Sequence, residues 1–207
     1  MCRVGTMFVV AAIGLGGLFA FGQDKPKAAG GTAGGASQEQ MMAAMMKSAA
    51  VGPEHERLKA MAGKFDADVS AFEAPGAPPE KSKGVATNEL ILGGRYLRSD
   101  YAGTIMGNMP FKGMGLFGYD NLKKKYVTLW IDEMSTQMQL SEGTADASGK
   151  VITTSGAFDS PMDSTKHTMK SVWTIVDNDH HTFEAWDIPP DGKGMKMLEI
   201  KYTRAKE

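Results

Sequence analysis

The sequence predicts an all-β protein, an antiparallel meander β-barrel of about ten strands that one or two short helices precede. Segments between Gly63 and Arg204 alternate apolar and polar residues with the period of two that is typical of strands. Clusters of Gly, Asp and Asn separate these segments, as in β-hairpins. No segment of helical length interrupts them, which argues against a parallel sheet. A long meander loses its exposed edges only by closing on itself, so a barrel is favoured.

Residues 1–22 have the pattern of a signal peptide. Arg3 supplies a positive charge, and residues 7–21 are an uncharged apolar stretch. Ala20 and Gly22 are small residues at the two positions that a signal peptidase recognises before it cleaves. We therefore predict cleavage before Gln23 and an exported protein, periplasmic or extracellular. The alternative is that the segment stays as a membrane anchor. Cleavage would also remove Cys2, the only cysteine, and would leave no segment for stable membrane insertion.

A flexible linker is predicted for residues 23–36, which are mostly Lys, Pro, Ala, Gly and Thr and have little apolar bulk to bury. The charge of the remaining chain is nearly balanced. Residues 1–22 contain Arg3 as their one charged residue, so 22 basic and 24 acidic residues remain, a net charge of −2. Such a balance gives no electrostatic footprint for nucleic acid, and we expect no nucleic-acid partner.

The linker leads into a methionine-rich helix, predicted for residues 37–51. A capping box begins at Ser37. Four methionines then share one helical face: Met41, Met42, Met45 and Met46. The barrel domain that follows, residues 52–207, is predicted to begin with a second short helix, which Pro53 starts and Gly63 ends.

Ten strands are predicted within this domain. They are residues 65–71, 83–92, 95–103, 111–119, 126–132, 137–145, 151–158, 168–176, 182–187 and 197–203. The proline-rich stretch 74–79 is predicted to be a loop. Asp120 and Asn121 are predicted to form the turn after the fourth strand, because Asn tolerates the left-handed backbone that a tight turn requires.

Several short strings, taken in order along the chain, carry a family resemblance. They are Gly52-Pro53-Glu54-His55, Ile91-Leu92-Gly93-Gly94-Arg95, Gly115-Leu116-Phe117-Gly118-Tyr119-Asp120-Asn121, Lys124-Lys125-Tyr126, Trp130-Ile131-Asp132, Ser141-Glu142-Gly143 and Asp179-His180-His181. Over residues 52–204 the chain resembles an uncharacterised bacterial family catalogued as DUF1579. That family has no established activity, so the resemblance implies lineage and no particular chemistry.

A wider resemblance is to the lipocalin-like, or calycin, β-barrels. In those proteins a short helix leads into Gly-x-Trp on the first strand, and a basic residue of the last strand covers the tryptophan. Here Gly63-Lys64-Phe65 stands at the first position and Arg204 at the second. Because Phe65 replaces tryptophan, the resemblance implies a weaker cation–π contact. Barrels of this size hold one small ligand or are filled by their own side chains.

No catalytic motif is present in the sequence, and we predict neither an enzyme nor a cofactor. There is no Gly-x-Ser-x-Gly string, and the cleaved chain would have no cysteine nucleophile. Asp132 and Glu133 are neighbours on a strand, so their carboxylates point to opposite faces and cannot act on one substrate.

Metal sites are weighed against simpler interpretations. His180 and His181, next to Asp177 and Asp179, are residue types that bind zinc, but adjacent strand residues point to opposite faces, which favours turn chemistry instead. The methionines are soft ligands that suit Cu(I), yet they are also flexible packing residues, and packing is the favoured interpretation.

A lipocalin-like barrel can also bind haem through one histidine, as nitrobindin-like proteins do. No particular histidine of this sequence is singled out for that role.

Two functional hypotheses from different classes remain open. In the first, the barrel binds a small apolar or amphipathic molecule, because barrel mouths are common ligand sites. Four residues are predicted to line that site: Arg95, Tyr101, Tyr119 and Trp130. In the second, side chains fill the barrel, and the protein is a structural or interaction module that docks an unidentified protein partner through the methionine-rich helix.

The predicted ligand site depends on which strand faces are interior. Trp130 shares a face with Tyr126, Thr128 and Asp132, and the opposite face carries Val127, Leu129 and Ile131. We expect Trp130 to face inward because large aromatic side chains are buried on average. The wholly apolar opposite face is the alternative core. Arg95 is also expected inside, where it would need a carboxylate partner or a bound anion.

Overall fold

The computed structural model of the chain describes residues 36–206. The predicted signal peptide and residues 23–35 of the predicted linker lie outside the described residues. Three helical elements precede the strands: α1 (Gln38–Ser48), α2 (Pro53–Arg57) and the 3-10 helix η1 (Leu58–Met61). No helix in this part of the chain has the length and apolar character needed to cross a lipid bilayer.

The start of α2 follows from its sequence. Pro53 occupies the first helical position, where its missing N–H group leaves no hydrogen bond unmade. The carbonyl oxygen of Gly52 accepts hydrogen bonds from the N–H groups of His55 and Glu56, at 3.0 and 3.1 Å. The Gly52 N–H in turn donates to Nδ1 of His55 at 3.1 Å. These bonds fix the point at which the chain enters the barrel.

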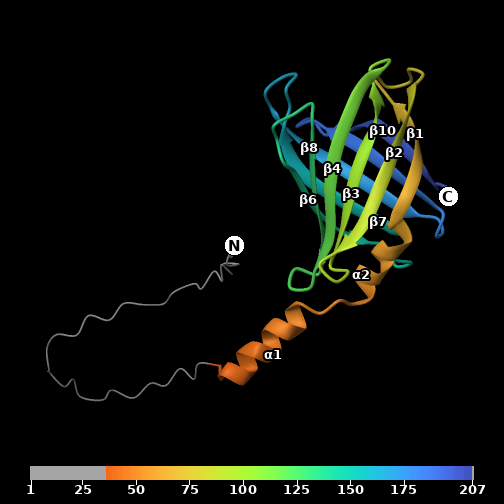
Figure 1. The fold of residues 1–207 in the computed structure, drawn as a ribbon. Coiled ribbons are helices and arrows are strands. Elements are labelled where there is room, and N and C mark those ends of the chain that lie inside the picture. The colour runs from red at the N-terminus through yellow and green to blue at the C-terminus, as the bar shows by residue number, and fades with distance from the viewer. Residues whose placement is uncertain (1–35, 207) are drawn as a thin grey trace, which may run out of the picture. The chain divides into compact units, whose positions relative to one another are not determined.

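Ten antiparallel strands follow the helices. They are β1 (Gly63–Ala71), β2 (Glu80–Ile91), β3 (Tyr96–Ile105), β4 (Met109–Asp120), β5 (Lys125–Asp132), β6 (Gln139–Ala145), β7 (Val151–Asp159), β8 (Lys166–Ile175), β9 (His180–Ile188) and β10 (Met195–Arg204). Each strand pairs with the next, and β1 also pairs with β10 (Figure 1), so the sheet closes into a barrel. The predicted fold class and the predicted number of strands are confirmed.

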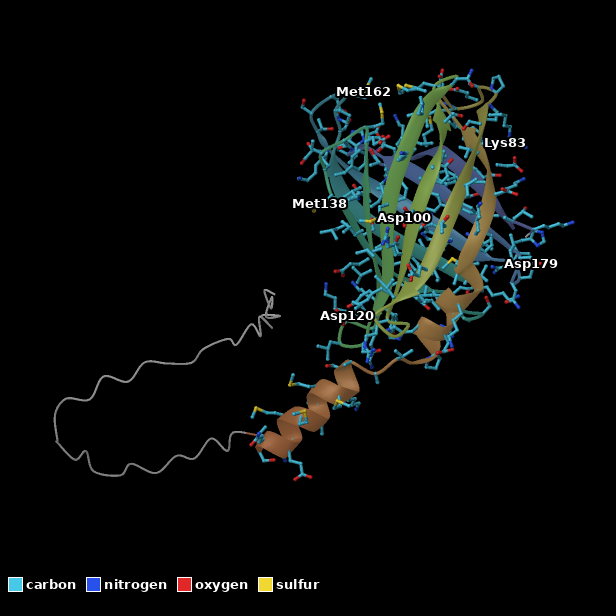
Figure 2. All side chains as sticks on the ribbon, viewed as in Figure 1. Lys83, Asp100, Asp120, Met138, Met162 and Asp179 are labelled. Carbon is cyan, nitrogen blue, oxygen red and sulfur yellow. The ribbon has the colours of Figure 1, made fainter. Side chains whose placement is uncertain are left out.

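One end of the barrel is plugged by η1. Leu58 and Met61 are 0% and 2% exposed. They belong to a single buried cluster with Leu97, Phe117, Tyr126, Ile152 and Ile175. We call this the lower end and the cluster the plug; the opposite end is the mouth. Figure 2 labels Met162, in the connection between β7 and β8 at the mouth, and Asp120 at the lower end.

Arg204, the last residue of β10, covers Phe65 from below. Its guanidinium carbon lies 4.5 Å from the centre of the Phe65 ring. The same guanidinium donates hydrogen bonds to the carbonyl oxygens of Ala62 and Ala60, at 2.8 and 3.1 Å. The basic residue that the lipocalin-like resemblance implied is therefore present, and it ties the end of the chain to η1.

The turn between β4 and β5 differs from its prediction. The residue with a left-handed backbone is Lys124, with φ of 54°, and not Asn121. Asn121 instead donates from its side-chain amide to the carbonyl oxygens of Ser48 and Ala50, both at 2.8 Å. Asp120 shapes the turn by accepting from the next N–H groups along the chain. The amide of Asn121 serves to hold the segment between α1 and α2.

Candidate functional site

The inner wall of the barrel above the plug is aromatic and only partly buried. In contrast to the plug residues, four inward-facing aromatic side chains keep partial exposure: Phe111, Trp130, Trp173 and Phe183. All four pack against the second buried cluster of the barrel, which contains Phe65, Tyr101 and Tyr202. These side chains point inward and line the space enclosed by the barrel above the plug. We call this interior space the chamber.

Gly113 of β4 is at the centre of the aromatic wall. A Cβ atom placed at Gly113 would lie 2.2 Å from Cζ2 of Trp130, so the indole ring rests directly on this glycine. In the strand register Gly113 has two neighbours across the sheet, Tyr101 on β3 and Asp132 on β5. The Tyr101 ring is 6.0 Å from that of Phe111. The indole Nε1 of Trp130 donates to Oδ2 of Asp132 at 2.7 Å.

A carboxylate–imidazole–carboxylate group lies nearer the mouth. Nδ1 of His167 is 2.7 Å from Oδ1 of Asp187, and its Nε2 is 3.1 Å from Oδ2 of Asp163. The hydrogen bond with Asp187, followed by that with Asp163, raises the pKa of His167. The backbone N–H of Thr165 and then His167 lower the pKa of Asp163. Each imidazole nitrogen of His167 is therefore engaged by a carboxylate, and neither is free to accept a proton from a substrate.

His181 lies deep in the barrel and is neutral. It is 2% exposed, stacks on Tyr202 with ring centres 4.4 Å apart, and meets the edge of Phe65 at 4.6 Å. Burial, with a contribution from the positive charge of Arg204, lowers the pKa of His181 to about 4. In the part of the chain that the structure describes, its Nδ1 has no hydrogen-bond partner, and the same holds for Oγ1 of Thr154. These polar atoms leave hydrogen-bonding capacity unused inside the barrel.

The structure brings together two of the four predicted site residues. Tyr101 and Trp130 face the chamber on either side of Gly113, which confirms the inward direction of Trp130. Tyr119 lies at the plug instead, where its ring is 5.1 Å from Tyr126 and 5.8 Å from His55.

Arg95 is not an interior residue of a strand. β3 begins at Tyr96, and Arg95 belongs to the preceding turn at the lower end. Its guanidinium donates to the carbonyl oxygens of Ala49 and Leu92, at 2.9 and 3.1 Å. Arg95 is thus hydrogen-bonded at the surface of the protein, and its guanidinium needs no interior carboxylate or bound anion as a partner. The turn extends one residue past Gly94, and this is why the strand starts later than predicted.

The apolar face of Val127, Leu129 and Ile131, which the sequence allowed as the alternative core, forms part of the outer wall of the barrel. Ile131 contributes there to a groove of about 490 Å³, whose side-chain walls include Val85, Ala102 and Met114. Asp100, labelled in Figure 2, points outward beside this groove. A second hollow lies beside the methionines of α1. The groove also borders Tyr101, Gly113 and Asp132, whose register positions face inward. Neither hollow is lined by the four aromatic side chains of the chamber, which is defined by their partial exposure.

The histidine pair near the lower end of β9 has the arrangement expected from strand geometry. His180 is exposed and bonds Asp177 in the turn, at 2.9 Å, while His181 points into the barrel. Within residues 36–206 no group of three or more His, Cys, Asp or Glu side chains is placed to hold a metal ion.

Residues 50–204 match the model of a family described as "Protein of unknown function (DUF1579)". The chain belongs to this family. Among solved structures, the DUF1579 chain is similar to Rv2717c from M. tuberculosis, with 12% sequence identity, a TM-score of 0.56, and coverage of 76% of this chain and 100% of the other. A redesigned β-barrel matches with 12% identity and a TM-score of 0.38, over 71% of this chain and 93% of the other. No curated protein matches the chain. At these identities the similarity to Rv2717c shows the fold alone.

Proposed function

We propose that this DUF1579 protein is an exported barrel that binds one small, largely apolar or amphipathic molecule in the chamber. The observation that carries the proposal is the partial exposure of Trp130, Trp173 and Phe183 on the inner wall, above a plug that excludes water. Large aromatic surfaces in contact with water inside a barrel favour an apolar ligand, because its binding would remove that surface from water.

Two features favour binding over a barrel filled for structure alone. Plug residues such as Leu58 and Ile152 are 0% exposed, so the sequence packs side chains tightly where the interior is filled. In addition, Thr154 and His181 keep unpartnered polar atoms in the interior, which a fully packed core seldom tolerates. The interaction-module alternative rests on the methionines of α1, which are 54–68% exposed.

Export belongs to the same proposal and rests on the pattern of residues 1–22. N-terminal sequencing of the protein from the cell exterior or periplasm is expected to begin at Gln23. A chain that began at Met1 in that fraction would contradict cleavage.

The binding proposal is tested by titrating the protein with N-phenyl-1-naphthylamine, a neutral apolar probe whose own fluorescence rises when it leaves water. We expect saturable binding of one probe per chain. Trp130→Ala removes part of the chamber wall and should weaken binding by about tenfold, since an aromatic wall of this size contributes on the order of 1.5 kcal/mol to an apolar contact.

Trp186→Ala is the matched control. Trp186 is also half-buried but lies on the outer wall, where Nζ of Lys196 is 5.8 Å from its ring centre. This variant should bind the probe as the wild type does. Equal loss of binding in both variants, or no saturable binding to the wild type, would overturn the proposal. Thermal melting of each variant establishes that it is folded.

A further inference from the structure

The charges on the inner wall have one sign. Asp132 faces the chamber beside Trp130, and Asp187 lies closer to the mouth, bonded to His167. Glu80 occupies the inward register position of β2 opposite Ala71, and its side chain accepts from the backbone of Gly107 at the rim. Among the described residues, the strands place no lysine or arginine at an inward-facing position above the plug. The chamber therefore repels anions and attracts cations.

His167 does not change this balance. Its imidazole lies between Asp163 and Asp187, so the three groups together are negative whether or not the histidine is protonated. Arg204 occupies an inward register position opposite Phe65, but it is at the lower end, where its guanidinium bonds the backbone carbonyls of Ala62 and Ala60. Within residues 36–206, the strands therefore offer no inward-facing lysine or arginine above the plug to pair with a carboxylate or phosphate group of a ligand in the chamber.

The aromatic groups around Asp132 offer a second kind of attraction for a cation. Tyr101, Phe111 and Trp130 surround Gly113, and Asp132 lies opposite that glycine in the register. Aromatic faces attract organic cations, and the attraction is greater where water is excluded. Oδ1 and Oδ2 of Asp132 each accept one hydrogen bond, from the Met134 N–H and the Trp130 indole, and these hold the carboxylate in place.

In the described part of the chain, two buried polar atoms of the barrel interior lack a hydrogen-bond partner. Among residues 36–206, nothing bonds Nδ1 of His181 or Oγ1 of Thr154, which belong to inward-facing residues that are 2% and 1% exposed. An unsatisfied buried polar atom costs about 1–3 kcal/mol. These two atoms leave hydrogen-bonding capacity unused in the interior below the chamber.

We propose that the ligand of the chamber is an amphipathic organic cation. Its ammonium group would lie beside Asp132, between the faces of Trp130, Tyr101 and Phe111, and its apolar part would extend toward Trp173 and Phe183. This inference rests on the proposed function, since it assigns a ligand class to the same chamber.

Three probes with the same chain length test the ligand class by calorimetric titration: octyltrimethylammonium, octan-1-ol and octanoate. Octyltrimethylammonium should bind the wild type at least about tenfold more tightly than octanoate, with octan-1-ol between them. Asp132→Asn removes the charge but keeps an oxygen that can accept from the Trp130 indole. It should weaken octyltrimethylammonium binding by about fivefold or more and leave octan-1-ol unchanged.

Asp100→Asn, on the outer wall, is the control and should leave all three affinities unchanged. If octan-1-ol binds but octanoate binds as tightly as the cation, or if Asp132→Asn has no effect, the cation assignment is wrong and the proposed function stands. If none of the three probes binds the wild type, the proposed function is overturned as well. The comparison of probes on the wild type remains decisive even if a variant fails to fold.

Discussion

Replacing Arg204 with alanine should lower the free energy of unfolding by about 3 kcal/mol. Arg204 donates to the carbonyl oxygens of Ala62 and Ala60 and lies 4.5 Å from the ring centre of Phe65. Loss of the guanidinium would remove the donor to three carbonyl groups, those of Ala62, Ala60 and Asn178, and would expose one face of a ring that is 0% exposed. Urea denaturation followed by circular dichroism measures the change.

Two variants separate these contributions. Arg204→Lys keeps the charge but cannot bond both carbonyls in one planar group, so it should recover only part of the lost stability. Arg98→Ala removes an arginine of the outer wall, which pairs with Asp100 at 2.8 Å and is 46% exposed, and should cost less than about 1 kcal/mol. An Arg204→Ala protein as stable as the Arg98→Ala protein would show that β10 is not tied to η1 through this side chain.

Acidification from pH 7 to pH 4 should destabilise the protein by about 3 kcal/mol through His181 alone. Burial lowers the pKa of His181 in the folded protein from 6.5 to about 4. Between these two values the unfolded chain binds a proton that the folded chain does not. Stability is therefore unaffected above pH 6.5, is lost as the pH falls toward 4, and loses no more from this residue below that value.

The contribution of His181 is isolated by comparing the wild type with His181→Phe, which keeps a ring against Tyr202 and cannot titrate. The difference in unfolding free energy between the two should change by about 3 kcal/mol from pH 7 to pH 4. His180→Phe, at an exposed position, is the control and should show no comparable change. This comparison removes the opposite effect of His167, whose raised pKa favours the folded state at low pH. A constant difference would mean that folding leaves the pKa of His181 unchanged, and would contradict its lowering by burial.

The alternation of residues was enough to predict the barrel, because each inward position is fixed by its neighbours two residues away. Alternation alone left two possible inward faces for this strand, and the tendency of large aromatic side chains to be buried favoured the face of Trp130. The contact between Arg204 and Phe65 was implied by the lipocalin-like resemblance, and the closure of the barrel brings the first and last strands together so that it can form.

Residues whose role depends on strand register or turn geometry could not be predicted. Arg95 follows three residues with positive φ, Leu92, Gly93 and Gly94, and the sequence alone does not show that the turn continues beyond them. His167 and Asp187 are 20 residues apart, and only the pairing of β8 with β9 brings them together. Asp132 was known to share a face with Trp130, but its place opposite Gly113 depends on the register of β4.

Native mass spectrometry of the protein purified from its own host is the most direct test of a ligand in the chamber. We expect a second species, heavier than the chain by the mass of one small molecule, that disappears on denaturation and is reduced in Trp130→Ala but not in Trp186→Ala. A wild-type spectrum with the mass of the chain alone, from protein that also fails to bind the neutral probe, would contradict the proposal that this barrel is a binding protein.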